Sequence, residues 1–210
     1  LTLGGAGTLN VTGNGNDGVS SSDGLVILGG KINVKADDDA VRGQDYVVIA
    51  GGTLDVNGKS NGIKSENETK SGRGYVLVTG GDLTINGGSS NAVNAKTEIV
   101  IAGGNIKIAG SKEGIEAAHV LLAGGKADVK TTDDGINATG VRPWLSVSGG
   151  EWRLDTGGDG FDSNGAAYIG GGKMTIYGPT DTRAASLDAE TGLEIDGGTL
   201  FAAGPSGMDE

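Results

Sequence analysis

A motif built on a pair of small residues, usually Gly-Gly, recurs nine times along the 210 residues and constrains the fold more than any other feature. The second small residue falls at positions 7, 30, 52, 81, 104, 125, 150, 172 and 198, so successive copies are 23, 22, 29, 23, 21, 25, 22 and 26 residues apart. Repeats of about 20 to 50 residues are typical of solenoids and propellers. We therefore expect a chain built from repeated units of similar structure.

Each copy carries the signals of three short strands. After the pair, apolar and polar residues alternate, as in "GGKINVKA" and "GGTLDVNG", which is the period of a strand with one buried face. A β-rich run such as "YVVIA" precedes the pair. A third short piece follows about nine residues later, around a single apolar residue. The apolar residues of this third piece are Val19, Val41, Ile63, Val93, Ile115, Ile136, Phe161, Leu187 and Met208.

Three short strands per turn predict an all-β protein, a right-handed parallel β-helix of about nine turns that forms a single domain over residues 1–210. The glycine pair permits a corner at which φ is positive, and parallel crossovers are nearly always right-handed. A propeller needs longer units of four strands, and leucine-rich repeats need helical returns. With 43 glycines the chain is also poorly suited to helices.

Charge and composition exclude several partners. There are 16 Lys and Arg against 27 Asp and Glu, a net charge of −11, so the basic footprint of a nucleic-acid-binding protein is missing. No apolar run approaches the length needed to span a bilayer. The chain has no cysteine and begins inside the repeat. We therefore interpret it as a fragment trimmed from a longer protein.

The phrase "TTDDGINATG" places two adjacent aspartates where stacked turns would align them with further acids. Neighbouring turns lie about 4.7–4.9 Å apart, which is roughly twice the length of a calcium–oxygen bond. A Ca²⁺ ion between two turns would therefore contact a carboxylate from each turn and offset the repulsion between the carboxylates. Mg²⁺ fits less well because it keeps its own waters. The alternative is that Asx-Gly simply forms turns. The candidate ligands, on three consecutive turns, are Glu113, Glu116, Asp133, Asp134, Asn137, Asp159 and Asp162.

Two columns of polar residues run along the third pieces, one two places before the apolar residue and one directly after it, and neither is acidic at every turn. Ala185 and Ser206 interrupt the first column, and Arg42 and Lys64 occupy the second near the start of the chain. We therefore do not expect one calcium ion per turn. At the N-terminal acidic stretch "ADDDA", Arg42 is expected to take over part of the neutralisation.

Two further columns are predicted on the outer surface. One, six places before the second glycine, contains Tyr46, Tyr75, Glu98, His119 and Trp144. Its rings are either platforms for apolar sugar faces or covers over corners of the barrel. The other is aliphatic, and a patch of this kind usually means contact with a neighbouring domain, another subunit or a ligand. The aliphatic column consists of Val26, Val48, Leu77, Val100 and Leu121.

The stretch "SKEGIEAAHVLLAGG" followed by "KTTDDGINATG" resembles a bacterial carbohydrate-binding β-helix domain family first recognised in cellulolytic clostridia. The resemblance extends over the whole chain, including the ending "GGTLFAAGPSGMDE". It implies a secreted or cell-surface bacterial protein that binds cellulose or acidic polysaccharides such as polygalacturonate. The family is similar in fold to family-nine pectate lyases, whose calcium site is also built from stacked aspartates. By that similarity the ligands are Glu116, Asp133, Asp134 and Asn137, followed by Asp159 and Asp162.

These observations favour a non-catalytic, calcium-binding carbohydrate-binding module, with Tyr46, Tyr75, His119 and Trp144 as candidate sugar contacts. One alternative is a calcium-dependent pectate lyase, which needs a Lys or Arg base of lowered pKa beside the ion. No nucleophile–base constellation is visible in the sequence. The second alternative is a structural stalk or adhesin module.

Overall fold

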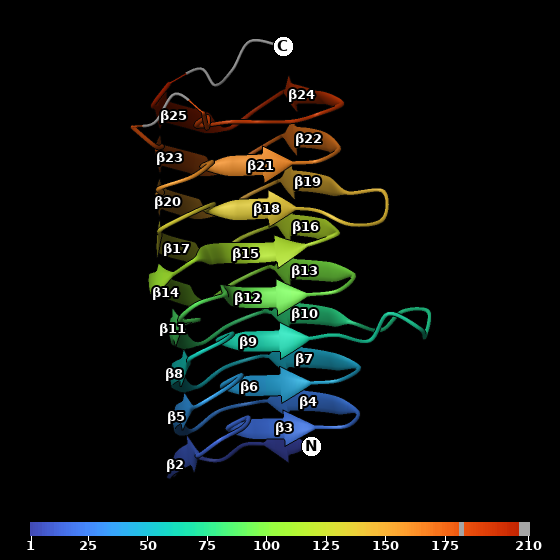
Figure 1. Cartoon of the computed structure of the whole chain (residues 1–210), viewed down its shortest axis with the longest axis vertical. Helices are drawn as coiled ribbons and strands as arrows, with labels where there is room; N and C mark the ends of the chain where they lie inside the picture. The colour runs from blue at the N-terminus through green and yellow to red at the C-terminus, as the bar shows by residue number, and fades with distance from the viewer. Residues whose placement is uncertain (181–182, 206–210) are drawn as a thin grey trace.

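The computed structural model describes residues 1–180 and 183–205. They form a column of stacked turns, with three strands in nearly every turn (Figure 1). All strand pairs are parallel, and they join equivalent strands of successive turns. The predicted parallel β-helix of about nine turns is confirmed. Met208 of the third piece and Ser206 lie outside the described residues. Among the described residues there is no helix that is long and apolar enough to cross a membrane.

The strands fall into three sheets, here called A, B and C. Sheet A consists of β1 (Thr2–Leu3), β4 (Gly24–Ile27), β7 (Tyr46–Ile49), β10 (Tyr75–Val78), β13 (Glu98–Ile101), β16 (His119–Leu122), β19 (Trp144–Val147), β22 (Ala166–Ile169) and β24 (Gly192–Ile195). Sheet B consists of β2 (Thr8–Gly13), β5 (Lys31–Ala36), β8 (Thr53–Gly58), β11 (Asp82–Asn86), β14 (Asn105–Ser111), β17 (Lys126–Thr131), β20 (Glu151–Asp155), β23 (Lys173–Tyr177) and β25 (Thr199–Ala203). Sheet C consists of β3 (Val19–Ser21), β6 (Val41–Gly43), β9 (Ile63–Ser65), β12 (Asn91–Ala95), β15 (Glu113–Ala117), β18 (Ile136–Ala138) and β21 (Phe161–Ser163).

The coil is right-handed, as expected. In Figure 1 the chain rises from the N-terminus while it crosses the front from left to right in sheet C and returns behind in sheet A. The eighth turn has only an isolated bridge, Phe161 to Leu187, in place of a strand of sheet C.

The core is a set of aliphatic ladders inside the three sheets. The strands alternate between buried and partly exposed residues, as the sequence predicted: in β8, Leu54 and Val56 are buried whereas Thr53 and Asp55 are exposed. The first and last copies differ, since Leu9 is 38% exposed and Ala202 is also exposed. Within the described residues these two turns have a neighbour on one side only, so the same pattern buries less surface there.

The glycine pairs form the corner between sheets A and B. The second glycine of eight pairs has a positive φ, between 78° and 103°. At Gly125 a Cβ atom would also lie 2.8 Å from the carbonyl oxygen of Gly104 on the preceding turn. Both the backbone angle and the close approach of successive turns therefore require glycine here.

Among the described residues, two long connections join a strand of sheet C to the following strand of sheet A. At most turns one or two residues join the two strands, such as Ala118 between β15 and β16. The connections 66–74 and 139–143 are longer, and both project from the same side of the column in Figure 1. These two insertions account for the long spacings of 29 and 25 residues in the repeat.

Candidate functional site

The predicted acid and amide columns lie on the outer face of sheet C. The strand register pairs Asn94 with Glu116, Glu116 with Asn137, and Asn137 with Asp162, each one turn from the next. We call these four residues the sheet C row. Because the side chains stand on equivalent positions of parallel strands, they are held one strand spacing apart.

Three of the seven predicted ligands, one of them Asp162 of this row, converge on one point. One carboxylate oxygen from each of Asp134, Asp159 and Asp162 lies within 4.8 Å of the others, close enough for a single calcium ion to contact all three. The carboxylates of Asp134 and Asp133 also lie against Gly158, where a Cβ atom would come 2.5 Å from Asp134 Oδ1. Only glycine leaves room for this arrangement.

The predicted ligands Asp134 and Asp159 also have a structural role that the sequence did not show. Asp134 Oδ1 accepts a hydrogen bond from the backbone N–H of Asp159 at 2.8 Å, and Asp159 Oδ1 accepts one from the N–H of Ala185. Asp39 Oδ1 does the same for Asn61, at 3.1 Å. In each case one carboxylate oxygen satisfies the backbone of the next turn, while the second oxygen of Asp39 pairs with Lys64 and that of Asp134 accepts a hydrogen bond from Asn137 Nδ2 at 3.3 Å.

The carboxyl groups of this cluster are strongly perturbed. Burial, followed by the charges of Asp134 and Asp159, raises the pKa of Asp162 from 3.8 to about 7. Burial also raises the pKa of Asp134 to about 6, with the neighbouring acids adding to the effect and the Asp159 N–H opposing it. The pKa of Asp159 is raised for the same main reason. Ionising these carboxyls together is therefore costly without a counter-ion.

Glu113, Glu116 and Asn137 form a second group of oxygen donors next to the first. Burial and the hydrogen bond with Glu116 raise the pKa of Glu113 to about 7. Glu113 Oε2 and Asn137 Oδ1 are buried and have no hydrogen-bond partner among the described residues. Buried polar atoms normally have one, so both are available to an additional ligand. The remaining candidate, Asp133, is more exposed and pairs at 3.2 Å with Lys112, which also pairs with Glu113 Oε1.

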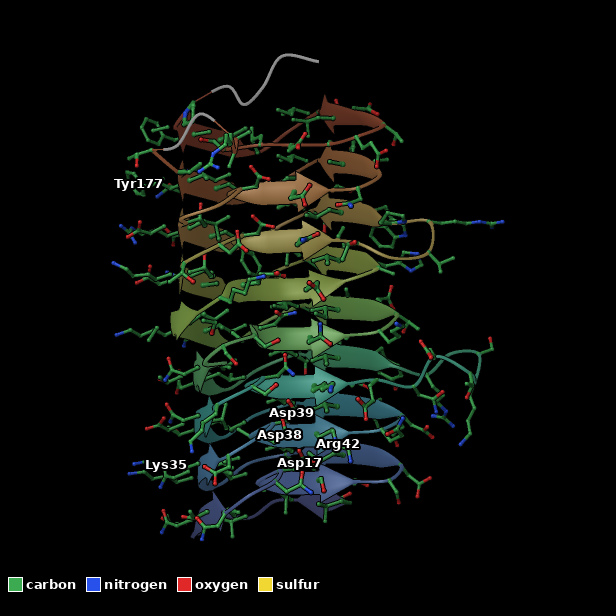
Figure 2. All side chains as sticks on the ribbon, in the orientation of Figure 1. Asp17, Lys35, Asp38, Asp39, Arg42 and Tyr177 are labelled. Carbon is green, nitrogen blue, oxygen red and sulfur yellow. The ribbon has the colours of Figure 1, made fainter. Side chains whose placement is uncertain are left out.

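The N-terminal half of the same face is neutralised by the protein itself (Figure 2). Arg42 bonds Asp17 at 2.8 Å and also Glu66, and Lys64 lies 3.3 Å from Asp39. The prediction that Arg42 neutralises the stretch ADDDA is wrong: Arg42 pairs with Asp17 and Glu66, whereas Asp37 pairs with Lys59 and Asp39 with Lys64. By contrast, no Lys or Arg among the described residues forms an ion pair with the three converging aspartates of the C-terminal half.

The predicted aromatic column lies on the outer face of sheet A, and its members are half-buried. The rings stack in two pairs along the column: Tyr46 on Tyr75 at 5.3 Å, and His119 on Trp144 at 5.1 Å. Glu98 separates the pairs. The free face of Tyr46 covers Gly24, where any Cβ atom would overlap the ring. These rings therefore turn their edges, rather than flat faces, outward along most of the column.

A groove of about 810 Å³ lies between the two long connections, at the corner of sheets C and A. The loops 66–74 and 139–143 form its walls, and the two intervening turns with short connections form its floor. Glu116 belongs both to this floor and to the sheet C row. His119 lines the groove where it opens on sheet A. One member of the sheet C row and one member of the aromatic column therefore lie in the same depression, which was not predicted from the sequence.

A hollow of about 430 Å³ lies on the outer face of sheet B. Its charges are already matched within the protein: Arg153 bonds Asp128 at 3.0 Å, and Glu151 lies between Lys126 and Lys173. The pKa of its Glu151 is lowered by hydrogen bonds with Lys173 and Lys126, and none of its lining residues has a buried polar side-chain atom without a partner. The acid cluster on sheet C, where burial raises the pKa values, is therefore the better candidate for a binding site.

A family model described as carbohydrate-binding domain-containing protein matches residues 1–160. The chain belongs to this carbohydrate-binding domain family. The match confirms the resemblance to such a family drawn from the sequence, and it implies a carbohydrate ligand. The matched region of the domain contains the whole groove and extends to Asp159. No curated protein and no solved structure matched the chain.

Lys64 and Lys112, which pair with acids near sheet C, are the lysines to consider as the base of a lyase. Burial alone would lower the pKa of Lys64, but Glu66 and Asp39 outweigh it and raise the pKa. Hydrogen bonds to Glu113 and Asp133 raise the pKa of Lys112. A general base needs a pKa shifted the other way.

The aliphatic column is present as expected, with its members paired from turn to turn and half-buried on sheet A. It ends at Ser146, which pairs with Leu121. Nothing among the described residues covers it.

Proposed function

We propose that this carbohydrate-binding domain is a non-catalytic module that binds acidic plant cell-wall polysaccharides with the help of calcium. The observation that carries the proposal is the cluster of Asp134, Asp159 and Asp162, half-buried and without a cationic partner among the described residues. Calcium prefers carboxylate and amide oxygens and takes six to eight of them, more than this cluster supplies. Oxygens of a ligand can fill the remaining positions.

Calcium would also explain how an acidic surface binds an acidic polymer. The protein carries a net charge of −11, so a uronate chain is repelled unless cations lie between them. An ion held by the aspartates can bridge to a uronate carboxylate. Affinities of extracellular calcium modules are about 10⁻⁴–10⁻³ M, which suits a protein that acts outside the cell, where these polymers occur.

Isothermal titration calorimetry with polygalacturonate in calcium and in EDTA tests the proposal. We expect binding in calcium and at least a tenfold loss in EDTA, and a similar loss in calcium for Asp134→Asn. Asp55→Asn, an exposed change of equal charge on sheet B, should bind like the parent. Equal affinity in calcium and EDTA, or binding to cellulose alone, contradicts the proposed acidic ligand. Binding to neither polymer would favour the structural stalk.

A further inference from the structure

The groove exists because two of the described turns carry an insertion at the corner between sheets C and A, whereas the two turns between them do not. In solenoids, insertions into individual repeats collect on one face, which is often the binding face. The loop 66–74 precedes β10 and the loop 139–143 precedes β19, and three strand spacings in sheet A separate these strands. At about 4.8 Å per spacing, the two insertion-bearing turns lie about 14 Å apart. The groove between them therefore crosses the axis and is wide enough for one saccharide chain.

The lining of the groove contains one lysine, Lys96, together with the acids Glu68 and Glu116. Lys96 lies in the floor, and Lys70 and Arg73 belong to one of the walls. Lys96 pairs with Glu68 while 56% of its side chain is exposed, whereas Arg73 lies 3.6 Å from the buried Asp45. An exposed pair such as Lys96 with Glu68 contributes little, so an anionic ligand can take the place of Glu68 at small cost.

The opposite wall is held in a strained conformation. Arg142 is the one residue other than glycine with a positive φ among the described residues, at 52°. Its carbonyl oxygen accepts a hydrogen bond from His119 Nε2 at 3.2 Å, and the His119 ring stacks on Trp144. Backbone strain of this kind costs about 1–3 kcal/mol and gathers at functional sites. His119 is thus a positioning residue that links the groove floor to the loop 139–143.

We propose that the groove between the loops 66–74 and 139–143 binds a single uronate chain across the solenoid axis, with Lys96 pairing with a uronate carboxylate. The chain enters from the sheet C row, where Glu116 lines the floor, and leaves past His119 on sheet A. The inference rests on the proposed function for its ligand class. It adds the groove as the place of binding, a polymer direction across the solenoid axis, and Lys96 as the cation that selects uronate over neutral sugar.

A charge reversal with a matched control tests the groove. Lys96→Glu should weaken binding of a tetragalacturonate, in calcium, about tenfold or more, because a like charge replaces an opposite one. Lys35→Glu makes the same change on sheet B, at the opposite edge of the column (Figure 2), and should leave affinity within about twofold of the parent. The methyl ester of the same oligosaccharide, which lacks the charge, should bind the parent more weakly.

A second readout reports where the ligand lies. Trp152 is buried in the core, whereas Trp144 is half-buried and stacks on His119, which lines the groove. Tetragalacturonate should therefore change the fluorescence of Trp144, and Trp144→Phe should abolish the change. Equal affinities of the Lys96→Glu and Lys35→Glu variants overturn the groove, even where EDTA still abolishes binding. Loss of binding in Lys96→Glu alone, with binding unaffected by EDTA, supports the groove and contradicts the calcium proposal.

Discussion

Replacing Asp162 by asparagine should change the stability of the protein in opposite directions with and without calcium. In the calcium-free protein the pKa of Asp162 is raised from 3.8 to about 7 by burial and by the neighbouring acids. A raised pKa means that the folded state resists ionisation more than the unfolded state does. The penalty is therefore absent below about pH 4, grows as the pH rises, and is complete above about pH 7.

The size of the penalty follows from the pKa. Each factor of ten in the acid constant corresponds to about 1.36 kcal/mol, which gives at most about 4 kcal/mol for Asp162. Because the side chain is only partly buried, solvent screening reduces this to about 1–2 kcal/mol. In EDTA at pH 8, Asp162→Asn should raise the melting temperature by about 2–8 °C, given about 2–4 °C per kcal/mol in a protein of this size. At pH 4 it should have almost no effect.

With calcium present the sign reverses, because the substitution removes a charged ligand from the ion. Differential scanning calorimetry of the parent, Asp162→Asn and the control Asp55→Asn, with calcium and with EDTA, measures both effects. Asp55 is exposed on sheet B, so its substitution should shift neither melting temperature by more than about 1 °C. A lower melting temperature of Asp162→Asn in EDTA at pH 8 would refute the reasoning, since it would show that the carboxylate is stabilising without an ion.

Three further outcomes are expected. EDTA should lower the melting temperature of the parent at pH 8 and much less at pH 5, because protons compete with calcium for carboxyls of raised pKa; an equal effect at both pH values contradicts this. Arg42→Gln should destabilise the protein by about 2 kcal/mol in urea unfolding, because the carboxylate of Asp17 loses its partner, and a neutral result would show that water replaces the guanidinium. Gly125→Ala should lower the free energy of unfolding by about 2–4 kcal/mol, through backbone strain and the contact with Gly104. Gly72→Ala, at a glycine with a positive φ but open space around it, should lower it by about 1 kcal/mol. Equal losses of stability in the two variants would contradict the role given to the close approach of the turns.

The fold was predictable because each turn repeats the same physical requirement. The alternation of Leu54 and Val56 with exposed residues, and the positive φ of glycines such as Gly125, recur at a fixed place in nearly every copy. Stacking then turns sequence columns into spatial rows, so the pairing of Glu116 with Asn137 also followed from the sequence.

The groove and the exact partners of the acids were not predictable in the same way. The groove depends on the departures from the repeat at 66–74 and 139–143, whose lengths were visible as long spacings but whose common side was not. The direction of each side chain also determines which acids belong to the cluster. Asp134 belongs to it, whereas Asp133, its neighbour in sequence, pairs with Lys112. A column assigns a residue to a face but does not fix its rotamer.

The placement of the two long connections makes the width of the groove adjustable only in whole steps. Each turn adds about 4.8 Å to the distance between the insertions, so moving the loop 139–143 from before β19 to before β16 or β22 would narrow or widen the channel by that amount. The inward positions recur in register at each of these turns, although the residues that fill them differ, as in Ala127, Trp152 and Met174. A protein of this design can change which polymers it accepts by relocating a loop, without altering the scaffold that carries it.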